Sequence, residues 1–172
     1  MFQELTHVTR TVAAAMVGLA SIGNAVGRVF WAWISDSITR RATFIVMFAI
    51  QVLLFRILPG ISSAPVLTVI TFLVLMCYGG GFGTMPAFTA DYFGLKNVGP
   101  IYGLMLTAWG AASAFGPLLI AYVRDISGSY RGALHIIGAI VFFSISLPFI
   151  ISPPHHRLSR VTNNKQQRTE AA

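Results

Sequence analysis

The chain has 172 residues, of which 55% are hydrophobic and only 10% are charged, and its mean hydropathy is +0.73. Soluble globular domains carry about 25% charged residues, so this composition excludes an ordinary soluble domain and indicates a membrane protein. The net charge of +7 does not indicate nucleic-acid binding, because no basic face with interleaved aromatic residues is present. The single cysteine, Cys77, lies in an apolar run, which excludes a disulfide framework and a cysteine metal site.

Five apolar runs follow one another along the chain, each bounded by turn-forming or charged residues. A helix needs about 20 residues to cross a hydrocarbon core of ~30 Å. The strict alternation of apolar and polar residues that is typical of barrel strands is not visible. We therefore predict an all-α integral membrane protein with transmembrane helices at about residues 11–33, 42–58, 65–88, 99–123 and 132–151.

Basic residues are distributed unequally between the two sides of the predicted membrane domain. By the positive-inside rule the richer side is cytoplasmic. We therefore predict a plasma-membrane protein with residues 1–10 outside the cell and the tail inside. The tail, residues 153–172, is polar and without apolar periodicity, so we predict a disordered segment. Its two adjacent histidines leave metal binding open beside simple contact with water or lipid headgroups. The richer side holds Arg40, Arg41, Lys96, Arg157, Arg160, Lys165 and Arg168, the other side holds Arg10, Arg56, Arg124 and Arg131, and the histidines are His155 and His156.

Arg28 lies inside the first apolar run, eight residues before Asp36, or about 12 Å along a helix. A guanidinium keeps its proton, so within a bilayer it must pair with an acid, snorkel to the interface or line a wet cavity. No acidic residue lies within the predicted spans to pair with it. Two interpretations therefore remain: snorkelling, or binding of an anion in a translocation cavity. In the second, the amide of Asn24, one turn earlier on the same face, would share the ligand.

Glycine and proline concentrate in the third and fourth runs. Small residues let helix backbones approach closely in lipid, and Gly and Pro allow bends where cavities form. The pattern fits close helix packing alone, and equally helices that deform during transport. A nucleotide-binding loop is rejected, because no Lys-Ser/Thr follows the glycines. These residues are Gly79, Gly80, Gly81, Gly83 and Pro86 in the third run, and Gly103, Gly110, Gly116 and Pro117 in the fourth.

The segment AWISDSITRR at Ala32–Arg41 resembles the cytoplasmic-loop motif of the major facilitator superfamily, G-x-x-x-D-R-x-G-R-R. The resemblance implies that its matching acidic and basic residues form a cytoplasmic gate, with simple positive-inside anchoring as the alternative. Asp36, Arg40 and Arg41 match the motif, whereas Ala32, Ser37 and Thr39 depart from it.

The segment GGGFGTMPAFTADYFGLKNVGPIYGLMLTAWGAASAFGP at Gly79–Pro117 is similar to the oxalate/formate antiporter family, which includes carriers of other small carboxylates. The resemblance covers roughly Thr11–Pro153 and implies helices eight to twelve of a twelve-helix carrier. Alternating access uses two six-helix bundles around a midplane site. The resemblance thus implies an incomplete C-terminal bundle, from a truncated or split chain or a misassigned start, with a separate N-terminal half as a partner.

Arg28 matches the eighth-helix arginine that holds the substrate carboxylate in monocarboxylate carriers of this superfamily. Asn24 falls where proton-coupled carriers have an acid, and Trp109 falls where the oxalate carrier has a lysine. The resemblance therefore implies transport of a small carboxylate, with a monoanion favoured over oxalate, by residues that need no cofactor. Trp109 and Tyr102 would line the cavity, although Trp109 also fits a packing or belt aromatic. The rival interpretations are a non-transporting packing subunit or inert remnant and, more distantly, a membrane enzyme.

Overall fold

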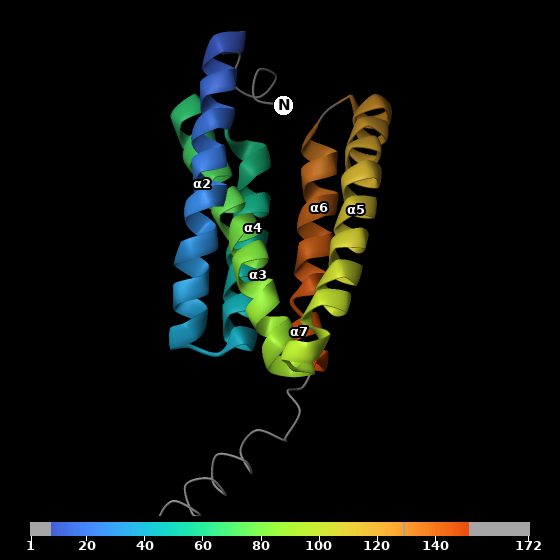
Figure 1. The fold of residues 1–172 in the computed structure, drawn as a ribbon. Helices are drawn as coiled ribbons and strands as arrows, with labels where there is room; N and C mark the ends of the chain where they lie inside the picture. Colours follow the sequence, from blue (N-terminus) through green and yellow to red (C-terminus); the bar gives the residue numbers. More distant parts are fainter. Residues whose placement is uncertain (1–7, 129, 152–172) are drawn as a thin grey trace, which may run out of the picture.

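The computed structural model describes residues 8–128 and 130–151, and these residues contain helices but no β-strand (Figure 1). Five helical segments are long and apolar enough to cross a membrane, which confirms the predicted all-α fold. The predicted tail, residues 153–172, and most of the predicted outer segment lie outside the described residues. The elements are α2 (Arg10–Ser37), α3 (Arg40–Ile57), η1 (Leu58–Gly60), α4 (Ala64–Phe93), η2 (Leu95–Asn97), α5 (Val98–Ser127), α6 (Tyr130–Ser144) and α7 (Leu147–Ile150).

The helices begin and end at residues with identifiable capping roles, and several are longer than predicted. The Thr39 hydroxyl accepts a hydrogen bond from the Ala42 amide at 3.2 Å, so α3 begins with only two residues between it and the end of α2. Helix α4 continues to Phe93, five residues past its predicted end, and stops at Gly94, where φ is +83°. Helix α5 stops in the same way at Gly128, where φ is +67°. Such positive φ angles favour glycine.

The last predicted span is not one continuous helix. A turn at residues 145–146 separates α6 from α7. Pro148 has no amide hydrogen to donate to the carbonyl of Ser144, and its ring crowds that carbonyl, so the helix breaks. By contrast, α4 and α5 run without interruption through Pro86 and Pro117. The two internal prolines therefore leave these helices continuous.

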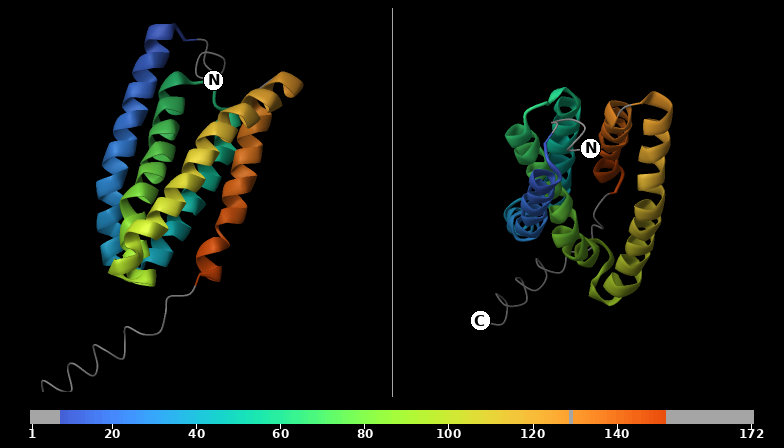
Figure 2. Two further views of the ribbon diagram at one scale, coloured as in Figure 1. Left: turned by 45° about the vertical axis from the view of Figure 1, so that its right-hand side comes forward. Right: turned by 90° about the horizontal axis from the view of Figure 1, so that it is seen from above.

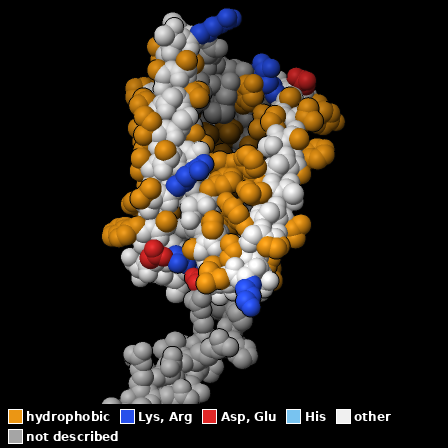
Figure 3. Space-filling model, viewed as in Figure 1, with side chains coloured by type: hydrophobic (Ala, Val, Ile, Leu, Met, Phe, Trp, Pro, Cys, Tyr) orange, Lys and Arg blue, Asp and Glu red, His pale blue; other side chains and the backbone are white. Residues whose placement is uncertain are grey.

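The helices form two groups that lie side by side, α2–α4 and α5–α6 (Figures 1 and 2). Helix α3 packs against α4 and also against α6, which joins the groups. Apolar side chains occupy the hollow between α2 and α5 on the face shown in Figure 3. Two buried clusters form the core: one around Trp31 and Phe44 holds the α2–α4 group together, and one around Leu67 also includes Leu134 of α6. No residue of α5 is buried, so this helix is the least covered of the long helices by the rest of the described structure.

Helices α2 and α4 are in direct backbone contact through glycines spaced four residues apart. A Cβ atom at Gly23 would lie 2.6 Å from the Phe72 carbonyl oxygen, and one at Gly27 would lie 2.7 Å from the Met76 carbonyl carbon. This is the small-xxx-small contact that lets helices approach closely in lipid. The spacing Gly23–Gly27 was readable in the sequence, but it was missed.

The predicted packing glycines divide into two kinds in the structure. A Cβ at Gly79 or Gly83 would meet backbone atoms of α2, and one at Gly80 would meet the Trp31 side chain. The other four glycines have no atom within 4 Å of the Cβ position, so nothing packs on them in the structure. These four are Gly81, Gly103, Gly110 and Gly116.

Candidate functional site

Arg28 projects from the part of α2 that lies against α4. Its backbone carbonyl lies against Gly83, and its guanidinium Cζ lies 5.6 Å from the centroid of the Phe82 ring. Within the described part of the chain, no carboxylate forms an ion pair with it. A cation over an aromatic face gains roughly 0.5–2 kcal/mol. The ring therefore offers this guanidinium a partner that leaves its N–H donors available.

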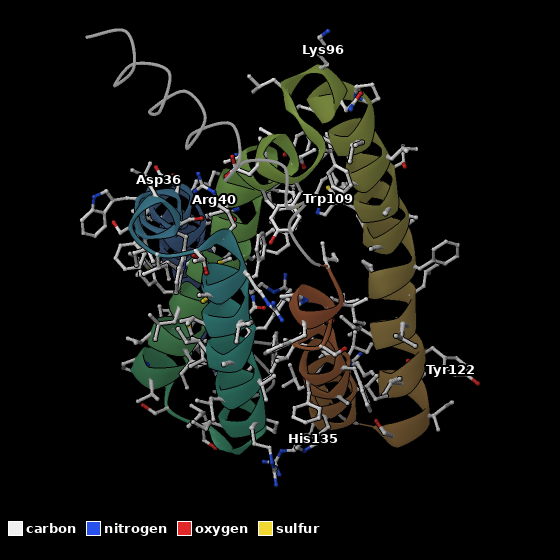
Figure 4. All side chains as sticks on the ribbon, turned by 90° about the horizontal axis from the view of Figure 1, so that it is seen from below. Asp36, Arg40, Lys96, Trp109, Tyr122 and His135 are labelled. Carbon is white, nitrogen blue, oxygen red and sulfur yellow. The ribbon has the colours of Figure 1, made fainter. Side chains whose placement is uncertain are left out.

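Phe82 also belongs to an aromatic cluster, formed by Tyr78, Phe82 and Trp109, that links α4 to α5. The Phe82 ring lies edge-on to Trp109 at 5.5 Å and to Tyr78 at 5.3 Å. The Trp109 indole N–H donates a hydrogen bond to the Tyr78 hydroxyl, and Figure 4 shows Trp109 directed from α5 toward α4. The structure thus connects Arg28 with Trp109 through Phe82. Tyr78 and Phe82 were missed, although their spacing of four residues places them on one helix face.

A cavity of about 230 Å³ opens beside this cluster, between α3, α4 and α5. Both predicted cavity residues, Tyr102 and Trp109, line it, whereas Arg28 and Asn24 do not. Its walls are mostly apolar and aromatic, so it offers contact area and few hydrogen-bonding groups. The lining residues are Phe44, Met47, Phe48, Gln51, Cys77, Tyr78, Gly81, Phe82, Met85, Tyr102, Met105, Leu106 and Trp109.

Asn24 lies in the contact between α2 and α4 rather than beside the cavity. Its backbone carbonyl and its Oδ1 both lie against Gly79. The Oδ1 atom is buried and has no hydrogen-bond partner among the described residues. The structure therefore does not bring the Asn24 side chain together with Tyr102 and Trp109.

Arg40 is the centre of an ionic network at the end of the bundle where α2 ends and α3 begins. Its Nη1 lies 2.6 Å from Asp36 Oδ1 and donates to the Ser35 hydroxyl at 2.8 Å, and its Nε donates to Asp91 Oδ2 at 3.0 Å. Asp36 and Arg40 lie next to each other in Figure 4. The network joins three helices, since Asp91 belongs to α4. Asp91 was missed because the third span was predicted to end at residue 88, and it corrects the expectation that no span contains an acid.

Arg41 points to a different partner. Its guanidinium Cζ lies 4.7 Å from the centroid of the Phe149 ring in α7. Its Nε is buried without a hydrogen-bond partner in the described structure. Of the three predicted gating residues, Asp36 and Arg40 are therefore in one network, and Arg41 instead connects α3 to α7.

No metal centre is evident among residues 8–128 and 130–151, where no group of three or more His, Cys, Asp or Glu side chains could hold an ion. The two histidines considered as metal ligands, His155 and His156, lie outside the described residues.

The sequence matches the family model of the Major Facilitator Superfamily over residues 1–171. The chain belongs to this superfamily of membrane transporters. The predicted family is thereby confirmed, as is the prediction that the chain is not an enzyme. With its five apolar helices, it is a multi-pass membrane protein.

Three curated relatives are similar to this chain. Apicoplast pyruvate carrier 2 of Toxoplasma gondii is 33% identical over 133 residues, which cover 74% of this chain and 20% of that carrier. The Oxalate:formate antiporter of Oxalobacter formigenes is 27% identical over 139 residues, 80% of this chain and 33% of the antiporter. Monocarboxylate transporter 13 of Rattus norvegicus is 30% identical over 152 residues, 83% of this chain and 33% of the transporter. The chain thus spans a fifth to a third of these relatives, and no solved structure matches it.

Proposed function

We propose that this chain is the C-terminal part of a carrier that moves small carboxylate anions across a membrane. The observation that carries the proposal is Arg28, a cation in an apolar helix whose neighbour is the Phe82 ring rather than an acid. Three relatives are named as carriers of pyruvate, of oxalate and formate, and of monocarboxylates. A guanidinium is suited to such substrates because two parallel N–H donors match the two oxygens of a carboxylate.

In the proposed mechanism, Arg28 binds the carboxylate from its position over Phe82. Trp109 and Tyr102 line the adjoining cavity and exclude water from the bound anion. Asn24 holds the backbone of α2 near Arg28 in place through its contact with Gly79. If the helices separate during transport, its amide would be free to bind the substrate. A monoanion is the preferred substrate, because Arg28 is the single cation of the site.

The network of Asp36, Arg40 and Asp91 is proposed to act as the gate. Its bonds join the ends of α2, α3 and α4, so opening the pathway at this end requires those bonds to break and re-form. Arg41 would hold α7 through the Phe149 ring during that movement. This end is proposed to face the cytoplasm and the opposite end the exterior of the plasma membrane, following the distribution of basic residues.

A separate N-terminal half is proposed as the partner that completes the pathway. Superfamily carriers place their substrate between two bundles, and this chain spans at most a third of the length of the three relatives named above. Helix α5 has no buried residue, and so retains apolar surface for such a partner. The competing proposal is a packing subunit or inert remnant, which would bind a partner without transport.

Uptake of labelled pyruvate, formate or oxalate tests the proposal in cells that co-express the chain with the N-terminal half of a related carrier. We expect uptake only when both parts are present. Arg28→Ala should abolish it and Arg28→Lys should retain a fraction, because the ammonium keeps the charge but not the fork of donors. Arg10→Ala, a cation at the start of α2 away from the site, is the matched control. Full uptake by Arg28→Ala would disprove the role of Arg28, and assembly without uptake would favour the packing subunit.

A further inference from the structure

A second cavity lies at the end of the bundle opposite Arg40, in a groove between α3 and α6. Its volume is about 280 Å³. It contains no residue of the candidate transport site. Val52, Phe55 and Arg56 line it from α3, and His135, Gly138, Ala139 and Phe142 line it from α6.

The mouth of this groove carries basic side chains. Arg56 lies in the last turn of α3, and His135 lies five residues after the start of α6, at the edge of the bundle in Figure 4. Both side chains are exposed, and neither has a hydrogen-bond or ion-pair partner within the described residues. Helix ends of this kind meet the membrane interface, where lipid phosphates are concentrated.

Below the mouth the groove is apolar. Ala139 and Phe142 follow His135 at four and seven residues along α6, and Val52 precedes Arg56 by four residues on α3. These spacings place them on the same helix faces, and seven residues span about 10 Å along a helix. The two helices are close at Gly138, where a Cβ would be in ordinary contact with the Phe55 Cβ at 3.4 Å. The groove thus descends from a polar mouth, which carries the Arg56 guanidinium and the His135 imidazole, to an apolar floor.

We propose that this groove binds an anionic phospholipid of the leaflet opposite Arg40. Its phosphate lies between Arg56 and His135, and one acyl chain lies along Val52, Ala139 and Phe142. Charge complementarity selects an anionic headgroup over a zwitterionic one, because a zwitterionic lipid adds a cation at the mouth. The apolar floor selects a lipid over a free anion, because a free anion gains nothing from it. The site is independent of the proposed transport function.

Native mass spectrometry and thermal unfolding of the purified chain in detergent micelles test this site. The probes are dioleoylphosphatidylglycerol, dioleoylphosphatidylcholine and inorganic phosphate alone. We expect phosphatidylglycerol to bind more tightly than phosphatidylcholine and phosphate to have no effect. The preference should fall about fivefold in Arg56→Gln, since an arginine near a lipid surface contributes about that factor. It should fall further in the double variant with His135→Gln, which also removes the imidazole as a hydrogen-bonding group for the phosphate.

Two further variants separate the headgroup contact from the apolar one. Arg10→Gln removes a cation from the same end of the bundle but outside the groove, and should keep the preference. Ala139→Trp fills the floor and should weaken both lipids equally. Equal binding of the two lipids by the unaltered chain would overturn the proposal. This comparison needs no variant, so it holds even if a variant fails to fold. So would a double variant that keeps the preference, or stabilisation by phosphate alone that matches the lipid.

Discussion

The contact between α2 and α4 at Gly27 permits a quantitative test of the fold. A Cβ atom there would lie 2.7 Å from the Met76 carbonyl carbon and 2.8 Å from its Cα, whereas ordinary contact begins at 3.4 Å. The Met76 carbonyl oxygen would lie closer still, and all three obstructing atoms are backbone, so the helices must separate. Overpacking costs about 1–3 kcal/mol, while replacing a helical glycine by alanine returns about 1 kcal/mol. We expect Gly27→Ala to lower the free energy of unfolding by up to about 2 kcal/mol.

Gly18 provides the matched control for this substitution. It lies in the same helix, and a Cβ there would meet nothing within 4 Å. Gly18→Ala should therefore raise the free energy of unfolding, by up to about 1 kcal/mol. The assay is reversible unfolding in mixed micelles titrated with dodecyl sulfate and followed by far-ultraviolet circular dichroism. Equal effects of the two substitutions would refute the reasoning, because they would mean that α2 does not touch α4 at Gly27.

Three other substitutions can be measured by the same titration. Asp91→Asn should destabilise the chain by about 1–3 kcal/mol and Asp36→Asn by under about 1 kcal/mol. The reason is exposure, since the Asp36 side chain is 68% exposed and that of Asp91 is 33% exposed. The reverse order would contradict the network. Phe82→Leu should cost about 1–2 kcal/mol from lost ring and cation contacts. Phe115→Leu, at an exposed position on α5, should cost less, and similar losses in the two variants would argue against the aromatic cluster. Gly94→Ala should cost about 1 kcal/mol or more because φ is +83° there, and an unchanged midpoint would exclude that backbone conformation.

The number and approximate position of the spanning helices followed from the sequence, because bilayer thickness fixes the length of an apolar helix. Their ends did not follow. Asp36 and Asp91 are polar, but helical hydrogen bonding continues past both to Ile38 and Gly94. Proline was an equally weak indicator of where a helix breaks, because the helix breaks just before Pro148 but continues through Pro86. Packing with neighbouring helices, which no local pattern contains, decides such cases.

The candidate site was predictable one residue at a time, but not as an arrangement. Arg28 stands out because a cation in an apolar run is costly. Its neighbour Phe82 does not stand out, since aromatic residues are common in such runs. Likewise the Gly23–Gly27 spacing is visible in the sequence, whereas the identity of the opposing helix is a tertiary fact. The sequence therefore identifies chemical types, and the packing of α2 on α4 determines which of them meet.

Arg28 and Arg40 differ in pairing, and this difference supports different proposed roles. Arg40 has two carboxylates and a hydroxyl within hydrogen-bonding distance, so a further anion would have to displace bonds of comparable strength. Arg28 faces a ring worth roughly 0.5–2 kcal/mol, and its carbonyl is held against Gly83. In the proposed role, a substrate carboxylate would bind the N–H donors that the ring leaves available, while the guanidinium and the helix stay in place. Backbone contact positions the cation without an acid that would compete for it, which is the arrangement that reversible binding of an anion requires.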